Sequence, residues 1–336
     1  MKVLLQGFLR ILGGVRPGLA TRGAVEQGTH FIFTGDRILT YNDQICISYP
    51  FETDFKCTVP ASEFYGILSG IEDEEVDVEV EGDRLFIEAK GMKACLVVSF
   101  SEEIIDLVNA LGLSGLKWSE LPRNFLRGIS FCLFSVSQDL TERFLSCIYV
   151  NGKDVVSSDD LRISHYEMEA GISFPFLLPG TSAIELVKFE VKRFCVGEAW
   201  IYFITDEGVV FCSRIIKGDY PDWSGNFDFQ GVKFQLPRGL RRSIENVSVL
   251  ADGEFDIEKR IDVEIGGGKI RCRGERDIGW IENELEMEGG EGVRFSINPL
   301  FFAKILERST YMVHGEGRAL FRTGFFRHLL SLRMDE

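Results

Sequence analysis

The sequence predicts an α+β protein of three similar domains, each with two helices packed on antiparallel sheets. Three segments that begin with a proline and continue at helical spacing recur along the 336 residues. Their prolines, Pro60, Pro179 and Pro299, lie 119 and 120 residues apart. Proline suits a first helical turn, where its missing N–H leaves no hydrogen bond unmade. A period of this length predicts one domain per copy, because domains commonly hold about 100–200 residues.

Alternating strands follow each proline-initiated helix. After the first helix, Val76, Val78 and Val80 alternate with acidic residues, and a turn at Gly82 leads into segment 85–87. Alternation of apolar and polar residues predicts antiparallel hairpins with one solvated face. The corresponding segments of the other two copies are 200–204 with 209–211, and 311–313 with 319–321 and 328–332.

A second helix opens each copy. The tripeptides Leu121-Pro122-Arg123 and Leu236-Pro237-Arg238 each lead into a helical pattern. The equivalent in the first copy is the N-terminal segment, from Val3 to about Leu12. We therefore predict three domains, at residues 1–118, 119–233 and 234–336.

Composition limits the class of protein. No stretch approaches the roughly 18–20 uncharged apolar residues of a membrane span, and no signal-peptide cleavage site follows the N-terminus. We therefore expect a soluble, cytoplasmic protein without a membrane partner. The eight cysteines include no C-x-x-C pair, so we expect free, buried thiols rather than a metal centre or disulfides. The net charge of −15 alone argues against a protein that coats nucleic acid.

Basic residues nevertheless gather on the predicted helices. Arg238, Arg241 and Arg242 stand at i, i+3 and i+4 and share one face. A charged face on a single surface helix is common and carries little information. The informative observation is the sign of the charge: the helix faces are basic, whereas strand faces such as Glu282 to Glu288 are acidic. Helices on one surface and sheets on the other would suit sequence-independent contact with DNA phosphates. The predicted DNA-binding residues are Lys2, Arg10, Arg123, Arg127, Lys188, Arg238, Arg241, Arg242, Lys304 and Arg308. The Pro60 helix departs from this pattern, because residues 62–75 contain no Lys or Arg.

Three motifs carry a family resemblance. The segment Lys217-Gly218-Asp219-Tyr220-Pro221-Asp222-Trp223 resembles the G-x-[FY]-P-[DN]-aromatic motif that ends the second domain of the bacterial beta sliding clamp and its phage-encoded relatives. The segment Ser157 to Ile163 is similar to the family's A-T-D-G-x-R-L strand, with Asp160 in place of glycine. Thr58-Val59-Pro60-Ala61 fits the helix start in the first domain. The resemblance covers nearly the whole chain, but the first 35 residues match poorly.

The resemblance implies the sliding-clamp, or processivity, fold and no enzymatic activity. Two subunits would form a head-to-tail homodimeric ring around double-stranded DNA, with helices lining the hole and continuous sheets forming the rim. The implied partners are a DNA polymerase, other proteins with a clamp-binding motif, and a clamp loader that uses ATP; the clamp itself needs no cofactor or metal. An apolar partner peptide would enter a pocket formed by Leu145, Ser158, Leu161, Arg162, Ile163, Leu329, Leu330, Leu332 and Met334. The alternative for this tail is an ordinary core strand, and Ser331-Leu332-Arg333 differs from the family's Met-Pro-Met run.

Two alternatives stay open. An enzyme is disfavoured because none of the four histidines lies in a catalytic motif, and Gly266-Gly267-Gly268-Lys269 lacks the remaining residues of a phosphate loop and predicts a hairpin turn. Asp159-Asp160 is a weak metal signal without a third ligand. The second alternative is an interaction scaffold that has the clamp fold but does not encircle DNA.

Overall fold

The computed structural model describes residues 1–20, 26–100, 103, 106, 109–113, 115–139, 141–228, 230–288, 292–315 and 317–332. The chain forms two compact units. Unit 1 comprises Met1–Leu126 and Leu178–Lys217, and unit 2 comprises Arg127–Leu177 and Gly218–Glu336. The predicted middle domain therefore contributes residues to both units. The domain boundaries near residues 118 and 233 remain a prediction.

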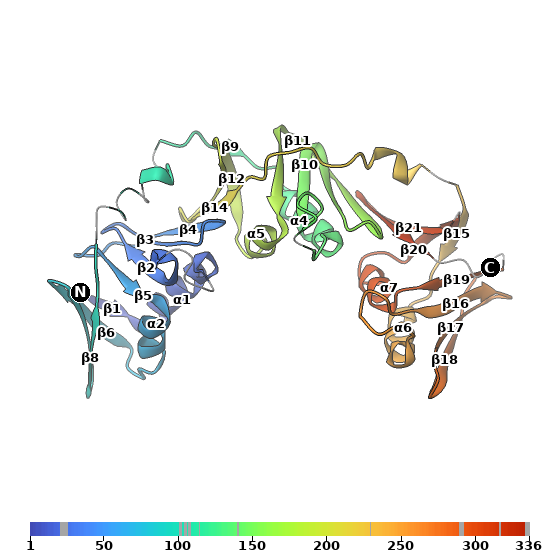
Figure 1. The fold of residues 1–336 in the computed structure, drawn as a ribbon, viewed down its shortest axis with the longest axis horizontal. Helices are drawn as coiled ribbons and strands as arrows, with labels where there is room; N and C mark the ends of the chain where they lie inside the picture. The colour runs from blue at the N-terminus through green and yellow to red at the C-terminus, as the bar shows by residue number, and fades with distance from the viewer. Residues whose placement is uncertain are drawn as a thin grey trace. The chain divides into compact units, whose positions relative to one another are not determined.

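Unit 1 is built on two antiparallel sheets (Figure 1). The larger has the order β5-β2-β3-β4-β14-β13-β12-β9, made of β5 (Cys57–Pro60), β2 (His30–Phe33), β3 (Arg37–Tyr41), β4 (Ile45–Pro50), β14 (Val210–Arg214), β13 (Trp200–Thr205), β12 (Val191–Val196) and β9 (Ser119–Glu120). The smaller contains β1 (Lys2–Leu4), β6 (Glu75–Glu81), β7 (Arg84–Ala89) and β8 (Met92–Val97) in that order. Its helices include α1 (Leu5–Val15), α2 (Ala61–Ser69) and α5 (Gly180–Leu186).

Phenylalanines form the core under α1 and α2. Phe8 of α1 lies fully buried, stacked on Phe51 with ring centroids 5.1 Å apart and edge-on to Phe64 of α2 at 5.9 Å. Phe33 of β2 contacts the same Phe64 ring at 6.1 Å. Offset and edge-on aromatic pairs add about 0.5–1.5 kcal/mol to the burial of their area. These contacts hold the two helices together against the sheet.

Unit 2 repeats this arrangement. Its larger sheet has the order β10-β11-β22-β21-β20-β15, made of β10 (Cys147–Ser158), β11 (Arg162–Pro179, whose last two residues belong to unit 1), β22 (Phe326–Ser331), β21 (Arg318–Thr323), β20 (Tyr311–Gly315) and β15 (Val232–Gln235). The smaller contains β18 (Gly279–Glu286), β17 (Lys269–Arg276), β16 (Ile261–Gly266) and β19 (Val293–Ile297). Helices α6 (Leu240–Val247) and α7 (Pro299–Leu306) lie here, and α4 (Phe125–Cys132) begins at the boundary between units.

The element order confirms the predicted α+β class with antiparallel sheets. A helix, strands, a second helix and further strands occur three times along the chain, starting at α1, α4 and α6. The predicted hairpins are confirmed as β6–β7, β13–β14 and β20–β21–β22. The glycine run is a hairpin turn between β16 and β17, in which Gly267 and Gly268 have φ of 61° and 78°. Such left-handed angles suit glycine, so no phosphate loop forms there.

All three prolines lie at helix starts, as predicted, but of the three only Pro299 lies within the first turn of its helix. Pro60 and Pro179 end strands β5 and β11 and cap the following helices in extended conformation, whereas Pro299 is the first residue of α7. The Asn298 side chain caps α7 by accepting hydrogen bonds from the N–H groups of Leu300 and Phe301. Proline's fixed φ suits both the N-cap and the first residue of a helix. A proline in the sequence therefore could not distinguish these two positions.

Two predicted helix starts were wrong. Helix α1 begins at Leu5, and Lys2 lies in strand β1, where it pairs with Asp77 of β6. The backbone of Lys2 to Leu4 therefore pairs with β6 and does not form a helical turn. In the third copy, Gly239 has φ of 94° and caps α6, so Arg238 precedes the helix and does not share a helical face with Arg241 and Arg242.

The strand face of the third copy that the sequence presents as acidic also carries arginines. Glu282 and Glu284 of β18 form ion pairs with Arg271 of β17 at 3.4 and 3.1 Å, and Arg273 adds a pair with Glu282 at 3.7 Å. Cross-strand pairing of opposite charges stabilises a sheet edge modestly. The contrast between basic helices and acidic strands is therefore weaker than the sequence indicated.

The thiols are free, and most are buried as predicted. Cys46, Cys57, Cys132, Cys147, Cys212 and Cys272 are buried, but Cys95 on the edge strand β8 is exposed and Cys195 is partly exposed. Burial raises the pKa of Cys57 and Cys272 to about 12. Within the described ranges, no helix has the length and apolar character needed to cross a bilayer.

Candidate functional site

The two segments predicted to form the peptide pocket are adjacent strands. Arg162 and Ile163 of β11 pair with Leu330 and Leu329 of β22, and the Ser331 N–H donates to the Leu161 carbonyl at 2.9 Å. Residues far apart in the sequence therefore meet on one sheet. Ser158 lies beside them, since its hydroxyl donates to the Arg162 carbonyl at 3.0 Å. The Leu145 carbonyl accepts a bond from the Ser137 N–H in the loop before β10.

Most of the C-terminal residues in this group belong to the core. Leu329, Leu330 and Leu332 are 5%, 2% and 9% exposed, so their side chains resemble those of an ordinary core strand. Leu161 is 39% exposed and Ile163 is half-buried. Met334 lies outside the described residues. An incoming peptide would therefore meet Leu161 and Ile163 before the leucines of β22.

Arg162 organises the turn between β10 and β11. Its guanidinium forms an ion pair with Asp159 at 2.6 Å and lies 3.7 Å from the Phe301 ring centroid and 5.1 Å from that of Phe134. A guanidinium between aromatic faces gains cation–π stabilisation. Asp159 is thus used as a structural counter-ion. Its neighbour Asp160 has φ of 64°, a conformation that glycine adopts more readily.

The motif at 217–223 packs on the same sheet of unit 2. The Tyr220 ring stacks on Tyr149 of β10 at 5.3 Å, and the Trp223 ring stacks on His165 of β11 at 4.8 Å. Burial raises the pKa of the Tyr220 phenol well above its ordinary value. Two parallel stacks therefore hold the segment that leads into the third copy.

His165 under Trp223 is held as a neutral ring. Its Nε2 lies 2.7 Å from Asp154 Oδ1, while Arg327 donates to Nδ1 from Nε at 3.2 Å and from Nη2 at 3.0 Å. Because Nδ1 accepts from a cation, it holds no proton in this arrangement. Burial lowers the pKa of His165, and the Asp154 hydrogen bond opposes that shift.

The predicted DNA-binding residues fall into two groups by their partners. Among the described residues, Lys2, Arg10, Arg123, Arg238 and Arg242 are exposed and form no ion pair. Arg127 is also exposed, with its guanidinium over the Phe131 ring. The others are engaged within the chain: Lys188 pairs with Glu185 at 2.7 Å, Arg241 with Glu245 at 2.8 Å and Glu307 at 3.1 Å, and Lys304 with Glu307 at 3.5 Å.

Arg308 is also engaged within the chain. Its Nη1 and Nη2 donate to the carbonyls of Phe131, at 2.5 Å, and Ser130, at 3.0 Å, at the end of α4. The guanidinium also lies 4.8 Å from the Phe131 ring centroid and 5.0 Å from that of Phe134. A cation at a helix C-terminus is favourable, and this one secures α7 to α4. The helical spacing of Lys304 and Arg308 could not reveal it, because α4 is remote in the sequence.

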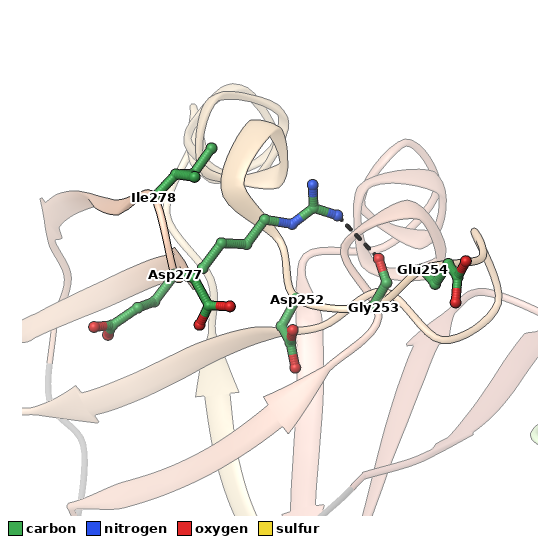
Figure 2. A pocket seen from close by; sticks show the side chains of 7 residues that line it. Asp252, Gly253, Glu254, Asp277 and Ile278 are labelled. Carbon is green, nitrogen blue, oxygen red and sulfur yellow. Dashed lines mark hydrogen bonds between the residues drawn. The ribbon is translucent and has the colours of Figure 1, made fainter.

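Sequence reasoning missed the cavities of the structure, among them two with charged linings. One of about 450 Å³ in unit 1 lies beside the start of α4 and is lined by Arg123 and by Lys192 of β12. The other, of about 840 Å³ in unit 2, is lined by Asp252, Gly253, Glu254, Glu275, Arg276, Asp277 and Ile278. Figure 2 shows Asp252, Glu254 and Asp277 around this cavity. No recognisable motif contains Lys192 or the acidic residues of segments 252–254 and 275–277. The sequence therefore contains no signal for these cavities.

The acidic cavity contains one cation that is already engaged. Arg276 donates from Nε to the Ala251 carbonyl at 2.7 Å and from Nη2 to the Gly253 carbonyl at 2.9 Å, and the second of these bonds is drawn in Figure 2. Glu275 is paired with Arg273 at 2.8 Å, so Asp252, Glu254 and Asp277 give the cavity its negative character. In the part of the chain that the structure describes, no group of three or more His, Cys, Asp or Glu side chains could hold a metal ion.

Comparison with known proteins matches this architecture to a single class. No protein-family model matches the sequence. The beta sliding clamp of Rickettsia felis is 26% identical over 209 residues, which is 55% of this chain and 55% of that protein. The match thus spans about half the length of this curated relative.

Solved structures match over the whole chain. The DNA polymerase sliding clamp of Bacillus subtilis superposes with a TM-score of 0.85 at 16% identity and covers 100% of this chain and 99% of its own. The DNA polymerase beta subunit of Streptococcus pyogenes gives 0.84 at 17%, and a Pseudomonas aeruginosa sliding clamp bound to griselimycin gives 0.84 at 16%; both cover 99% of each chain.

The chain therefore has the sliding-clamp fold. Within that class it resembles the beta sliding clamps of bacteria, in sequence over half of its length and in fold over all of it. The resemblance first indicated by the motifs at Ser157 to Ile163 and Lys217 to Trp223 is thereby confirmed.

Proposed function

We propose that this chain is a subunit of a DNA sliding clamp that encircles double-stranded DNA and tethers a DNA polymerase, without catalysing a reaction. The observation that carries the proposal is the match of the whole chain to sliding clamps at TM-scores of 0.81–0.85. The exposed arginines Arg10, Arg123, Arg238 and Arg242 support a sequence-independent contact with phosphates. We place the protein in the cytoplasm, with three domains at 1–118, 119–233 and 234–336, and with a clamp loader as a further partner.

A homodimeric ring requires two complementary surfaces, and the structure offers candidates for both. Strand β8 is an outer strand of its sheet in unit 1, and β18 is an outer strand in unit 2. An outer strand presents unpaired N–H and C=O groups that can pair with another chain. Exposed apolar residues accompany each strand: Val97 is 72% exposed on β8, while Ile278 and Trp280 near β18 are 83% and 58% exposed.

Charge supports a head-to-tail contact between these edges. The hairpin β7–β8 and its turn carry exposed Arg84 and Lys90, together with Lys93, which pairs with Glu88 at 2.6 Å. The acidic cavity beside the start of β18 carries Asp252, Glu254, Glu275 and Asp277. Opposite potentials align two surfaces and speed their association. We propose that β8 of one copy meets β18 of the next.

Retention on circular DNA tests the ring. Purified protein should be a dimer by light scattering at micromolar concentration and a ring with a central hole in negative-stain images. Once loaded on a circular plasmid, it should stay bound through gel filtration and be released when the plasmid is linearised. A stable monomer, or equal retention on linear and circular DNA, would contradict the proposal. A monomer that still binds partner peptides would favour the non-encircling scaffold.

The peptide pocket gives a separate prediction. Leu161→Glu places a charge where an apolar peptide would bury its side chain, so we expect at least a tenfold loss of affinity for a polymerase peptide, corresponding to about 1.4 kcal/mol or more. Because Leu161 is 39% exposed, folding stability should change by less than about 0.5 kcal/mol. Fluorescence anisotropy and thermal melting measure the two effects.

Ile184→Glu is the matched control, since Ile184 is 48% exposed on α5 and lies outside the proposed pocket. It should leave peptide affinity unchanged. If the two variants bind the peptide with equal affinity, Leu161 is not part of the pocket.

A further inference from the structure

A row of paired residues crosses four strands of the larger sheet in unit 1. Tyr41 of β3 pairs with Cys46 of β4, Cys46 with Cys212 of β14, and Cys212 with Tyr202 of β13. Directly opposed residues on antiparallel strands have their side chains on the same face, with Cβ atoms about 4.5–5.5 Å apart. The two thiols are therefore neighbours across the β4–β14 pair.

Both thiols are enclosed in the same core cluster. Cys46 and Cys212 are each 0% exposed and pack with Tyr41, Trp200 and Tyr202. Burial raises the pKa of both tyrosines to about 12, so their phenols stay protonated at neutral pH. Only a small neutral oxidant can reach such a site without unfolding it.

A half-buried cation lies close to the pair. The Arg37 guanidinium donates through Nη2 to the carbonyls of Ser48 at 3.0 Å and Gly208 at 2.8 Å. Its positive charge interacts with the sulfurs of Cys46 and Cys212. Burial, followed by the hydrogen bond with the Cys46 thiol, raises the pKa of Cys212 well above its ordinary value. A raised pKa disfavours the Cys212 thiolate, so we assign the first attack to Cys46.

We propose that Cys46 and Cys212 form an oxidation site at which hydrogen peroxide produces an intramolecular disulfide. The Cys46 sulfur attacks one peroxide oxygen, the O–O bond breaks, and Cys46 becomes a sulfenic acid while one water leaves. The Cys212 sulfur then attacks the Cys46 sulfur, the S–S bond forms, and the hydroxyl departs as a second water with the Cys212 proton. Two thiols lose two electrons and one peroxide gains them.

The disulfide would join two parts of the chain that are far apart in sequence. Strand β4 ends the group β5-β2-β3-β4 from the first copy, and β14 begins the group β14-β13-β12-β9 from the second. A cross-link between residues 46 and 212 restricts the unfolded chain strongly, because the closed loop is long. The oxidised protein should therefore melt at a higher temperature. This inference does not depend on ring formation or DNA binding.

Peptide mapping of the full chain tests the site. The protein is treated with hydrogen peroxide, remaining thiols are alkylated in denaturant, and trypsin releases peptides 38–56, with Cys46, and 194–214, with Cys195 and Cys212. We expect a linked pair, lighter than the two reduced peptides by two hydrogen atoms, with fragmentation that places the bond on Cys212. Dithiothreitol should abolish both the link and the rise in melting temperature.

Variants identify the sulfurs involved. Cys46→Ala and Cys212→Ala should each lose the link, whereas Cys195→Ser should keep it, since Cys195 pairs with Tyr202 and not with a cysteine. Exposed Cys95 serves as an internal measure of oxidation in the wild-type chain. The proposal is wrong if Cys95 is fully oxidised while Cys46 and Cys212 are both recovered alkylated, or if the link contains Cys195 instead.

Discussion

Reversal of Arg238 and Arg242 to glutamate is expected to weaken binding to duplex DNA more than any other pair of charge reversals in unit 2. Both side chains are exposed, and among the described residues neither forms an ion pair, so both charges are available to phosphates. Each lost phosphate contact lowers the slope of log affinity against log salt by about 0.9, so the double variant should lose about 1.8. A lost charge-assisted contact costs roughly 1.5–3 kcal/mol, which predicts at least a tenfold weakening at low salt.

Binding titrations over a range of salt concentrations measure both quantities. Lys153→Glu with Lys233→Glu is the matched control, because it changes the net charge equally at two exposed strand residues of unit 2. The control should leave the slope unchanged. An equal loss in both double variants would show that only net charge matters and would reject the assignment of this surface to DNA.

Arg241 should behave differently from its neighbours. Its guanidinium already pairs with Glu245 on α6 and Glu307 beyond α7. Part of its charge is therefore neutralised within the chain, and Arg241→Glu also leaves three carboxylates together. The ranking of Arg238 and Arg242 above Arg241 comes from the structure, because the sequence alone predicts that all three share one helical face.

Local signals were sufficient for the architecture. The recurrent prolines at 60, 179 and 299 and the alternation around Val76 to Val80 depend on backbone preferences that act within a few residues, and they predicted helices and hairpins correctly. The same logic placed Lys2 in a helix, although pairing with Asp77 draws it into a strand. A partner about seventy-five residues away leaves no trace in a local pattern.

The candidate site depended more strongly on distant contacts. The motif resemblance brought segment 158–163 and segment 329–332 together, and β11–β22 pairing confirms that they adjoin. Sequence alone could not show that Leu330 is 2% exposed while Leu161 remains accessible. It also could not show that Arg308 is used by the carbonyls of α4. Burial and hydrogen-bond partners follow from tertiary packing, which periodicity does not encode.

Three buried histidines give the second large expected effect, a loss of stability between pH 7.5 and 5.5. Burial lowers the pKa of His165, His314 and His328 in the folded chain. In the unfolded chain each histidine binds a proton below about pH 6.5. The unfolded state therefore holds more protons as the pH falls, so stability is complete above pH 6.5 and decreases below it.

The magnitude has an upper bound of about 1.4 kcal/mol per histidine over that interval, or about 4 kcal/mol for all three. Denaturant unfolding followed at several pH values measures it. Exposed carboxylates such as Asp139 and Asp222, whose hydrogen bonds lower their pKa, respond only at lower pH. The interval from pH 7.5 to 5.5 therefore lies above the range in which these two carboxylates respond.

His314→Phe separates this mechanism from a general acid effect. The His314 ring stacks on Phe295 at 5.1 Å, and its Nε2 is buried without a hydrogen-bond partner among the described residues. Phenylalanine keeps the stacking and removes the titrating nitrogen, so stability at pH 7.5 should be equal or higher and the loss at pH 5.5 smaller by up to about 1.4 kcal/mol. If His314→Phe follows the wild-type profile, protonation of His314 is not part of the acid transition.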